Sequence, residues 1–208
     1  MKREGEEKME GPRGTEEDEF SLVLDLVNLV FRTSRSLPAT MRQEFPLLFR
    51  ESNLENLRII LDNGKPVSHI GICQADTSLY GCKVRVGMVG AVCTHPEYRG
   101  RGLATKVLAD CIRKMSNDGV DIVLVSGIRS LYYRAGCVIA GRVYRVKISK
   151  EDSERLPLQG FELKPLEEGN ILDVVEAHQK EPVRFYRTLG DLQELLQAAI
   201  VDYRTGTV

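Results

Sequence analysis

The chain opens with a polar segment and continues with a strongly apolar helical pattern. Residues 1–14 are polar and contain glycine, which predicts a flexible N-terminal segment. The run Thr15-Glu16-Glu17-Asp18 is typical of a capping box that opens a helix. Two stripes of apolar residues follow at helical spacing, Phe20, Val23, Val27 and Val30 in one and Leu22, Leu26 and Leu29 in the other. A helix that is apolar on two faces is expected to be covered on two sides.

The next pattern changes from helix to strand. A second helix is expected over 39–49, with Pro38 close to its start and Pro46 bending it. Asn63-Gly64 then separates two apolar runs, and this dipeptide is the strongest short hairpin signal. Four strands are expected here, at residues 57–61, 67–75, 83–86 and 88–93, the last of them small, apolar and buried on both faces.

A turn-rich loop at 95–102 interrupts the strands. Apolar residues recur after it at helical spacing from Leu103 to Met115, and Asn117-Asp118-Gly119 ends that helix. The remaining elements expected in this part are a buried strand at 121–125, a short helix at 128–134 and a long strand at 137–148. Hairpins followed by strand–helix–strand predict an α/β (α+β) fold, with a mixed, mostly antiparallel central sheet flanked by helices.

The patterns divide the chain into four segments, a flexible start at 1–14, a main domain at 15–150, a charged linker at 151–162 and a segment at 163–208 with two helical stretches. Two helices in about 45 residues bury too little surface to be a stable domain alone. We therefore expect this last segment to begin a second, incomplete domain in a polypeptide that continues past Val208, or to form an oligomer.

Composition sets limits on the partners and on the compartment. The 208 residues include 29 basic and 30 acidic ones, a net charge of −1 that provides no global field for nucleic acid or anionic membranes. The N-terminus has no apolar signal-peptide region, and the longest apolar run, 22–31, is too short to span a bilayer. We expect a soluble, cytoplasmic protein without nucleic-acid or membrane partners. The five cysteines form no CxxC pair, so no disulfide framework and no metal site is expected.

The candidate chemistry lies in a strand, a glycine-rich loop and the start of a helix. Helix N-termini present unpaired backbone N–H groups and a positive dipole, and glycines let the backbone approach a bulky anion. The pattern predicts a pyrophosphate cradle formed by Val92, Cys93, Thr94, Arg99, Gly100, Arg101, Gly102, Leu103, Ala104 and Thr105. The side chain of Arg101 can point away while its N–H binds. Neither the Rossmann fingerprint nor the P-loop pattern is present.

The run Arg99-Gly100-Arg101-Gly102-Leu103-Ala104 fits the motif [QR]-x-x-G-x-[GA], and Gly90 to Pro96 upstream has a matching strand end. In these features the chain resembles the GNAT superfamily of N-acetyltransferases. The resemblance implies the GNAT fold over roughly 15–148 and acetyl-CoA as the co-substrate, with no metal.

A second segment, Leu131 to Cys137, resembles the YxxxG[FY] segment of the same family. The resemblance implies that Tyr132 protonates the departing thiolate. Cys137 replaces the usual aromatic residue, and Val125 stands where an asparagine is often found. Ser126-Gly127 instead resembles the branch of the enhanced intracellular survival protein, whose members have tandem GNAT-like domains.

The implied reaction is direct attack of an amine on the thioester carbonyl. A lysine-like amine of pKa about 10.4 costs roughly 4.6 kcal/mol to neutralise at pH 7, so a base or a water chain would help. Residues 88–94 contain no carboxylate, and the base is not identifiable from the sequence. In the tandem-domain branch the C-terminal carboxylate serves as the base. A backbone N–H near Val92 or Cys93 would stabilise the oxyanion, whereas Cys93 itself lacks an activating partner and is not expected to be a nucleophile.

Two functional hypotheses remain open at this level. One is an active N-acetyltransferase with an unknown amine acceptor, and the other is a GNAT-like module that binds acyl-CoA without turnover. His69 and His178 have no partners in the sequence and are expected to be structural, and His95 in the loop is expected to be solvated. The oligomeric state, including a possible homo-oligomer, is not determined by these patterns.

Overall fold

The computed structural model describes residues 9–141, 147, 149–155, 160, 168–198, 200–201 and 204–205. A six-stranded sheet has the order β1-β2-β3-β4-β5, with β6 paired to the far part of β3. The strands of this sheet are β1 (Met9–Arg13), β2 (Leu57–Asp62), β3 (Lys65–Leu79), β4 (Cys82–Thr94), β5 (Ile122–Val125) and β6 (Val183–Phe185). Pairing is antiparallel throughout, except that β5 runs parallel to β4. The predicted mixed, mostly antiparallel sheet is confirmed.

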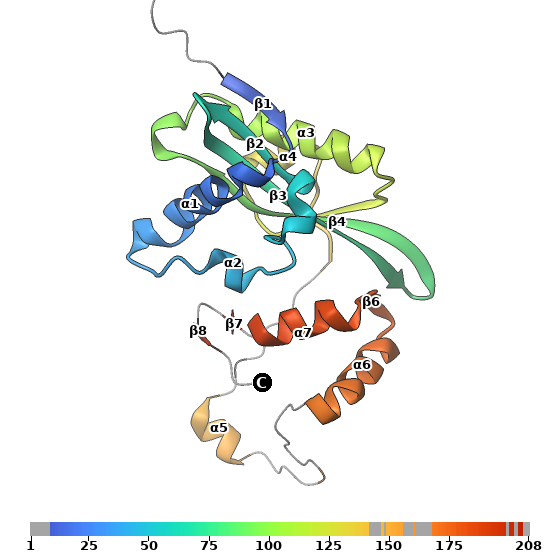
Figure 1. The fold of residues 1–208 in the computed structure, drawn as a ribbon. Coiled ribbons are helices and arrows are strands. Elements are labelled where there is room, and N and C mark those ends of the chain that lie inside the picture. Colours follow the sequence, from blue (N-terminus) through green and yellow to red (C-terminus); the bar gives the residue numbers. More distant parts are fainter. Residues whose placement is uncertain are drawn as a thin grey trace, which may run out of the picture.

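The helices within residues 20–134 flank this sheet, the later helices lie apart from it, and a short separate hairpin follows (Figure 1). The α-helices are α1 (Phe20–Phe31), α2 (Met41–Glu44), α3 (Leu103–Asn117), α4 (Ser130–Arg134), α5 (Lys150–Arg155), α6 (Ile171–Lys180) and α7 (Leu189–Ala198). The separate hairpin consists of β7 (Ile200–Val201) and β8 (Arg204–Thr205). No helix in the described ranges is long and apolar enough to cross a membrane.

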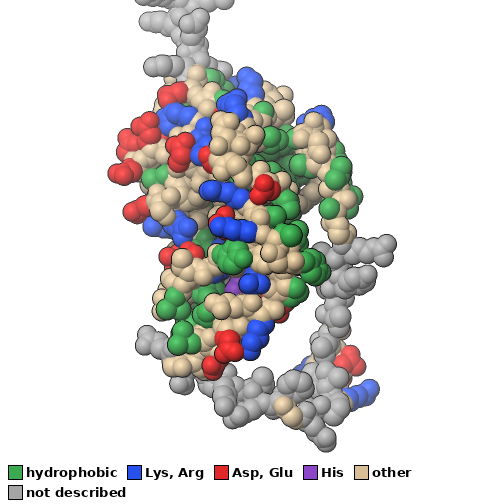
Figure 2. Space-filling model, turned by 90° about the vertical axis from the view of Figure 1, so that its right-hand side faces the viewer, with side chains coloured by type: hydrophobic (Ala, Val, Ile, Leu, Met, Phe, Trp, Pro, Cys, Tyr) green, Lys and Arg blue, Asp and Glu red, His purple; other side chains and the backbone are tan. Residues whose placement is uncertain are grey.

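The core lies on both faces of the sheet, and β2 shows why. All six of its residues are buried. Because successive side chains of a strand point to opposite faces, Leu57, Ile59 and Leu61 pack with α1 and α2, whereas Ile60 packs with α3. The α1 side and the α3 side are therefore two separate apolar layers. On the surface, acidic and basic side chains both lie on the face that Figure 2 shows, with hydrophobic side chains between them.

Several predicted elements are found close to where the sequence places them. Asn63 and Gly64 both have positive φ, 49° and 77°, and join β2 to β3 as the hairpin signal predicts. Helix α3 begins at Leu103 and its C-cap is Asp118, also as predicted. The two strands expected at 83–86 and 88–93 form one continuous strand, β4. Gly87 lets α3 pack close to this strand, because a Cβ at position 87 would lie 2.5 Å from the sulfur of Met115.

The start of the chain differs from the prediction. The prediction that residues 1–14 are flexible is wrong for residues 9–13, which form β1 and pair with β2. Thr15 does not cap a helix, because its hydroxyl donates to the carbonyl of Leu57 at 2.6 Å. The backbone N–H of Glu16 instead donates to Glu19 Oε2 at 2.8 Å, in a 3-10 turn, Glu17–Glu19, ahead of α1. Leu22 on the second apolar stripe stays 39% exposed, so α1 is not covered on two sides there.

Three further expectations need correction. The helix over 39–49 is only the four-residue α2, because Pro46 lacks an N–H and restricts the backbone of the residue before it. Strand β5 is not buried, because in the described part of the chain β4 is its one partner in the sheet. The linker expected at 151–162 stays a prediction, and its first residues belong to α5. Of the strand expected over 137–148, residues 137–140 are not extended strand, and 142–146 and 148 lie outside the described residues.

Candidate functional site

The site begins where the two parallel strands separate. Strand β5 ends at Val125, which pairs with Val89, so the part of β4 from Gly90 onward has no partner in β5. The gap between the diverging strands is the point at which backbone N–H groups of β4 can reach a ligand. After β5 the chain turns through Gly127 into α4.

A β-bulge lies in the same stretch of β4. The register of β3 against β4 shifts by one residue between His69 and Gly71. Ala91 and Val92 of β4 therefore lie opposite one residue of β3, Ile70. Ala91 has φ of 50°, which is uncommon for a residue with a side chain. The bulge changes the direction of the backbone where β4 and β5 diverge. The oxyanion N–H expected near Val92 would lie in this stretch.

The loop after β4 is fixed by aromatic and ionic contacts. The hydroxyl of Tyr98 donates to Asp62 Oδ2 at 2.6 Å, which ties the loop to the end of β2. The guanidinium of Arg101 lies 4.8 Å from the centre of the Tyr98 ring. Arg99 donates from Nε to the carbonyl of Thr94 at 3.3 Å. These contacts hold the loop in place before any ligand arrives.

Two left-handed glycines bring the loop to the start of α3. Gly100 and Gly102 have φ of 79° and 75°, and Gly102 is the N-cap of the helix. Thr105 donates its N–H to Gly102 O at 3.1 Å, so this group is used within the first turn. The N–H groups of Gly102, Leu103 and Ala104 donate to no backbone carbonyl in the described ranges. They are the groups that the helix terminus offers to an anion.

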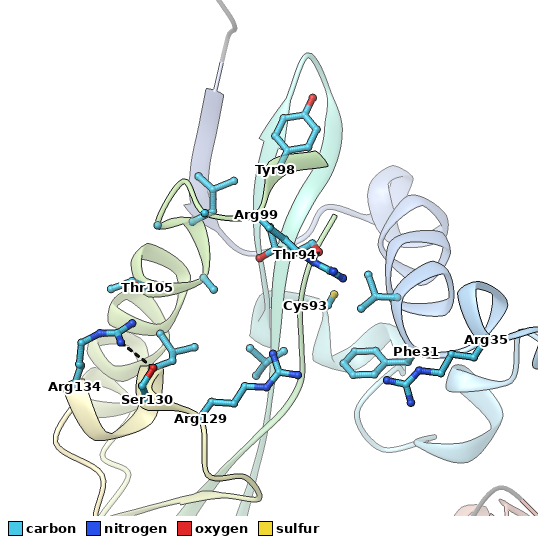
Figure 3. Close-up of a pocket in the computed structure, with 17 residues that line it drawn as sticks. Phe31, Arg35, Cys93, Thr94, Tyr98, Arg99, Thr105, Arg129, Ser130 and Arg134 are labelled. Carbon is cyan, nitrogen blue, oxygen red and sulfur yellow. Dashed lines mark hydrogen bonds between the residues drawn. The ribbon is translucent and has the colours of Figure 1, made fainter. Parts of the chain in front are cut away.

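A cavity of about 730 Å³ lies in front of this helix terminus (Figure 3). Its walls come from the end of α1, the end of β4, the loop, α3 and the segment around α4. The charged residues that line it are all arginines, Arg35, Arg99, Arg129 and Arg134. Arg35 and Arg129 reach it from opposite sides in Figure 3. Together with the helix dipole, this rim favours an anionic ligand.

The structure brings most of the predicted cradle residues together at this cavity. Nine of the ten line it, namely Val92, Cys93, Thr94, Arg99, Gly100, Gly102, Leu103, Ala104 and Thr105. Arg101 does not line the cavity, because its side chain packs on Tyr98. Sequence reasoning missed Phe31, Arg35 and Arg129, which come from other elements. A helix-end arginine and a loop arginine carry no local signal that would have identified them.

A second cavity of about 350 Å³ adjoins the first and contains Tyr132. Three residues line both cavities, Phe31, Val92 and Arg129. Apolar side chains dominate its other walls. Its second arginine, Arg32, is neutralised by a buried ion pair with Glu44, whose Oε1 accepts from Arg32 Nε at 2.7 Å. A ligand that extends through the shared wall would place its end between the bulge and Tyr132.

Burial sets the protonation of the groups at this junction. Tyr132 is 7% exposed, and burial raises the pKa of its hydroxyl, opposed by Arg129 and reinforced by Cys137. Its hydroxyl therefore stays protonated at neutral pH, as a proton donor requires. Burial also raises the pKa of the Cys93 thiol to about 12. A thiol that stays protonated is a poor nucleophile, which agrees with the expectation for Cys93.

Other titratable residues were expected to be structural or solvated. His69 is fully buried, as a structural residue would be. His178 donates from Nε2 to the carbonyl of Phe185 at 2.9 Å, and the side chain of His95 caps the 3-10 turn at Pro96–Tyr98. Within the described residues, no group of three or more His, Cys, Asp or Glu side chains could hold a metal ion.

Comparison with protein families decides the assignment of the fold. The sequence profile described as "Acetyltransferase (GNAT) domain" matches residues 12–140, more than half of the chain. The chain belongs to the GNAT acetyltransferase family. The match spans the sheet from the end of β1 to β5, the glycine-rich loop and Tyr132. A search of curated proteins finds no matching sequence.

Solved structures with the GNAT fold agree with this assignment. A predicted acetyltransferase with acetyl-CoA from Clostridium acetobutylicum has a TM-score of 0.55 and 18% identity, over 67% of this chain and 96% of that one. A GNAT family acetyltransferase from Brucella melitensis in complex with acetyl-CoA has a TM-score of 0.52 and 16% identity, over 62% and 82%. At these identities the likeness shows the fold alone.

Some similar proteins are much longer than this GNAT chain. A GCN5-related N-acetyltransferase from Kribbella flavida has a TM-score of 0.51 and 19% identity, and the match covers 62% of this chain but 32% of that one. A probable N-acyltransferase from Enterococcus faecalis has a TM-score of 0.48 and 16% identity, and the match covers 63% of this chain and 32% of that one. The chain thus spans about a third of the length of these two relatives.

Proposed function

We propose that this chain transfers the acetyl group of acetyl-CoA to an amine acceptor by direct attack. The observation that carries the proposal is the start of α3, where three N–H groups donate to no backbone carbonyl of the described residues and line an arginine-rimmed cavity that adjoins Tyr132. The proposal assigns the pyrophosphate of acetyl-CoA to the N–H groups of Gly102, Leu103 and Ala104. Acetyl-CoA in two of the similar solved acetyltransferase structures supports the choice of co-substrate.

The shared wall between the cavities is the place for the chemistry. The acetyl carbonyl would lie where β4 and β5 diverge, and a backbone N–H of the β4 bulge would stabilise the oxyanion there. The acceptor amine would approach from the second cavity. Its nitrogen bonds to the carbonyl carbon, the C–S bond breaks, and the thiolate takes the proton of Tyr132.

The proton of the acceptor amine needs a separate route. No carboxylate is among the residues that line either cavity in the described ranges. A water chain through the second cavity would carry this proton to solvent and would return a proton to the Tyr132 phenolate. Membership of the branch with tandem GNAT-like domains, in which a C-terminal carboxylate is the base, stays a prediction based on Ser126-Gly127.

Binding of CoA tests the cradle directly. Gly102→Asp places a side chain at φ of 75° and a negative charge beside the exposed N–H groups, so calorimetry should show CoA affinity reduced by at least about tenfold. Gly64→Asp is the matched control, because Gly64 also has a positive φ and open space around it but lies in the β2–β3 hairpin. Equal affinity in the two variants would place the pyrophosphate elsewhere.

Turnover separates an enzyme from a binding module. Thiol release from acetyl-CoA should depend on an added amine from a mixed panel of acceptors. CoA binding without amine-dependent thiol release for any acceptor would contradict the proposed transfer and favour a module that binds without turnover.

A further inference from the structure

The β-bulge of β4 is held by a side chain from the neighbouring strand. His69 of β3 is 0% exposed, and its Nδ1 lies 3.0 Å from the carbonyl oxygen of Ala91. Ala91 is the bulge residue with positive φ. A side chain on one strand thus fixes the most unusual peptide of the next strand.

The contact also determines the tautomer of the ring. A carbonyl oxygen can only accept a hydrogen bond, so Nδ1 must carry the proton and donate it. The other ring nitrogen, Nε2, is buried and has no hydrogen-bond partner among the described residues. Burial lowers the pKa of His69 to about 4, so the ring is neutral at pH 7 and Nε2 is unprotonated. The hydrogen bond to Ala91 is therefore the one polar interaction of this ring in the described part of the chain.

The bulge matters because of where it lies. Ala91 lines the second cavity and Val92 lines both. A non-glycine residue in the left-handed region is strained and persists only where its surroundings hold it there. Without the donor on His69, the segment could relax toward regular strand, which would turn the N–H groups of this stretch away from the cavities.

We propose that His69 is a positioning residue that holds the β4 bulge in the geometry that transition-state stabilisation requires. The inference rests on the proposed acetyl transfer, in which the bulge supplies the oxyanion N–H. His69 does not line either cavity, so it acts through the backbone of Ala91 and not on the substrate.

Two substitutions separate the hydrogen bond from simple packing. In His69→Asn the amide nitrogen occupies the position of Nδ1 and can donate to Ala91, whereas His69→Leu has a similar branched shape and no donor. Both lose the stacking of the ring on Phe49, whose centroid lies 6.1 Å away. Differences between the two variants therefore report on the amide group, whose nitrogen supplies the donor.

Kinetics give the first measurement. His69→Leu should lower kcat by about tenfold to a hundredfold while KM for acetyl-CoA changes by less than about twofold, because the defect lies at the carbonyl and not at the pyrophosphate. His69→Asn should stay within about threefold of the wild-type kcat. Equal loss in the two variants, or a rise in KM with kcat unchanged, would overturn the inference.

Hydrogen exchange gives a second measurement that does not need turnover. Amides of 90–94 should exchange faster in His69→Leu than in His69→Asn, while a peptide from α3 exchanges equally in both. Equal exchange of 90–94 in the two variants would refute the role of His69. If the wild-type protein showed no acetyl transfer, the proposed function would be contradicted, but the role of His69 would not. The exchange comparison would still decide whether His69 holds the bulge.

Discussion

Tyr132 and His69 are both buried beside the point where β4 leaves β5, and burial acts on them in opposite directions. Desolvation disfavours the charged form of each group. It raises the pKa of the Tyr132 hydroxyl and lowers that of the His69 ring. At neutral pH both groups are therefore neutral, the first as a possible proton donor and the second as a fixed hydrogen-bond donor.

The role of Tyr132 can be tested by removing one oxygen. Tyr132→Phe keeps the ring that packs beside Gly127 but cannot protonate the thiolate. We expect kcat to fall by roughly 10²- to 10⁴-fold, with CoA affinity nearly unchanged. Steady-state kinetics and calorimetry on the same preparation would check both. An unchanged kcat would reduce Tyr132 to a packing residue.

The ionisation of His69 predicts a dependence of stability on pH. Its pKa in the folded state, about 4, lies below the ordinary value of 6.5, so the unfolded chain takes up a proton first as the pH falls. The contribution to stability is present above pH 6.5 and is lost between 6.5 and about 4, by about 3 kcal/mol in total. Urea unfolding of the wild type and of His69→Asn at several pH values would measure it. Parallel curves for the two proteins would contradict the assignment.

Helix α3, which presents the cradle N–H groups, is joined to the sheet by a buried ion pair. Arg58 of β2 donates from Nε to Asp110 Oδ2 at 2.6 Å, and the two side chains are 9% and 4% exposed. Arg113 also pairs with Asp110, but its side chain is 66% exposed. The first contact spans two elements, whereas the second lies within one helix.

This difference predicts two very different costs. Asp110→Ala removes the buried carboxylate and leaves Arg58 paired with the exposed carboxylate of Glu55, at 3.2 Å, so it should destabilise the fold by about 3 kcal/mol. Arg113→Ala removes an exposed pair and should cost less than about 1 kcal/mol. Chemical denaturation of both variants would compare them. Similar losses for the two would show that the Arg58 pair does not hold α3 to the sheet.

The whole molecule is unevenly packed. Among the described residues, the buried apolar ones all lie between Phe20 and Tyr132, and no residue of α6, β6 or the described part of α7 is buried. This later segment lies apart from the helix-covered sheet in Figure 1 and joins it through β6, which pairs with Thr77 to Leu79. An ion pair from Arg50 to Asp191, at 2.8 Å, adds a second contact. That 163–208 begins a second GNAT-like domain stays a prediction.

Uneven packing predicts uneven hydrogen exchange. Amides of α6, β6 and α7 should exchange through local opening and much faster than those of β2 and the first half of β3, which require global unfolding. Mass spectrometry of exchanged peptides would show the two classes. Increasing concentrations of urea should speed exchange in β2 far more than in α6. Equal protection across both parts would contradict this division.

The sequence by itself determined the features that depend on local backbone chemistry. Asn63-Gly64 predicted a hairpin because its turn needs two positive φ angles, and Gly100 and Gly102 predicted the loop because only glycine adopts such angles readily. The helical spacing after Leu103 located α3 and, with it, the end of the helix that faces the large cavity.

Only the tertiary structure decided the features that depend on contacts between distant segments. Ala91 has no local signal for a bulge, since alanine is ordinary in a strand, and its geometry comes from the register against β3 and the His69 hydrogen bond. Arg35 and Arg129 meet at one cavity because α1 and the segment before α4 pack on either side of β4. Residue types and their spacing along the chain determine backbone angles and which face of a helix or strand is apolar. They do not determine which distant side chains the fold brings together.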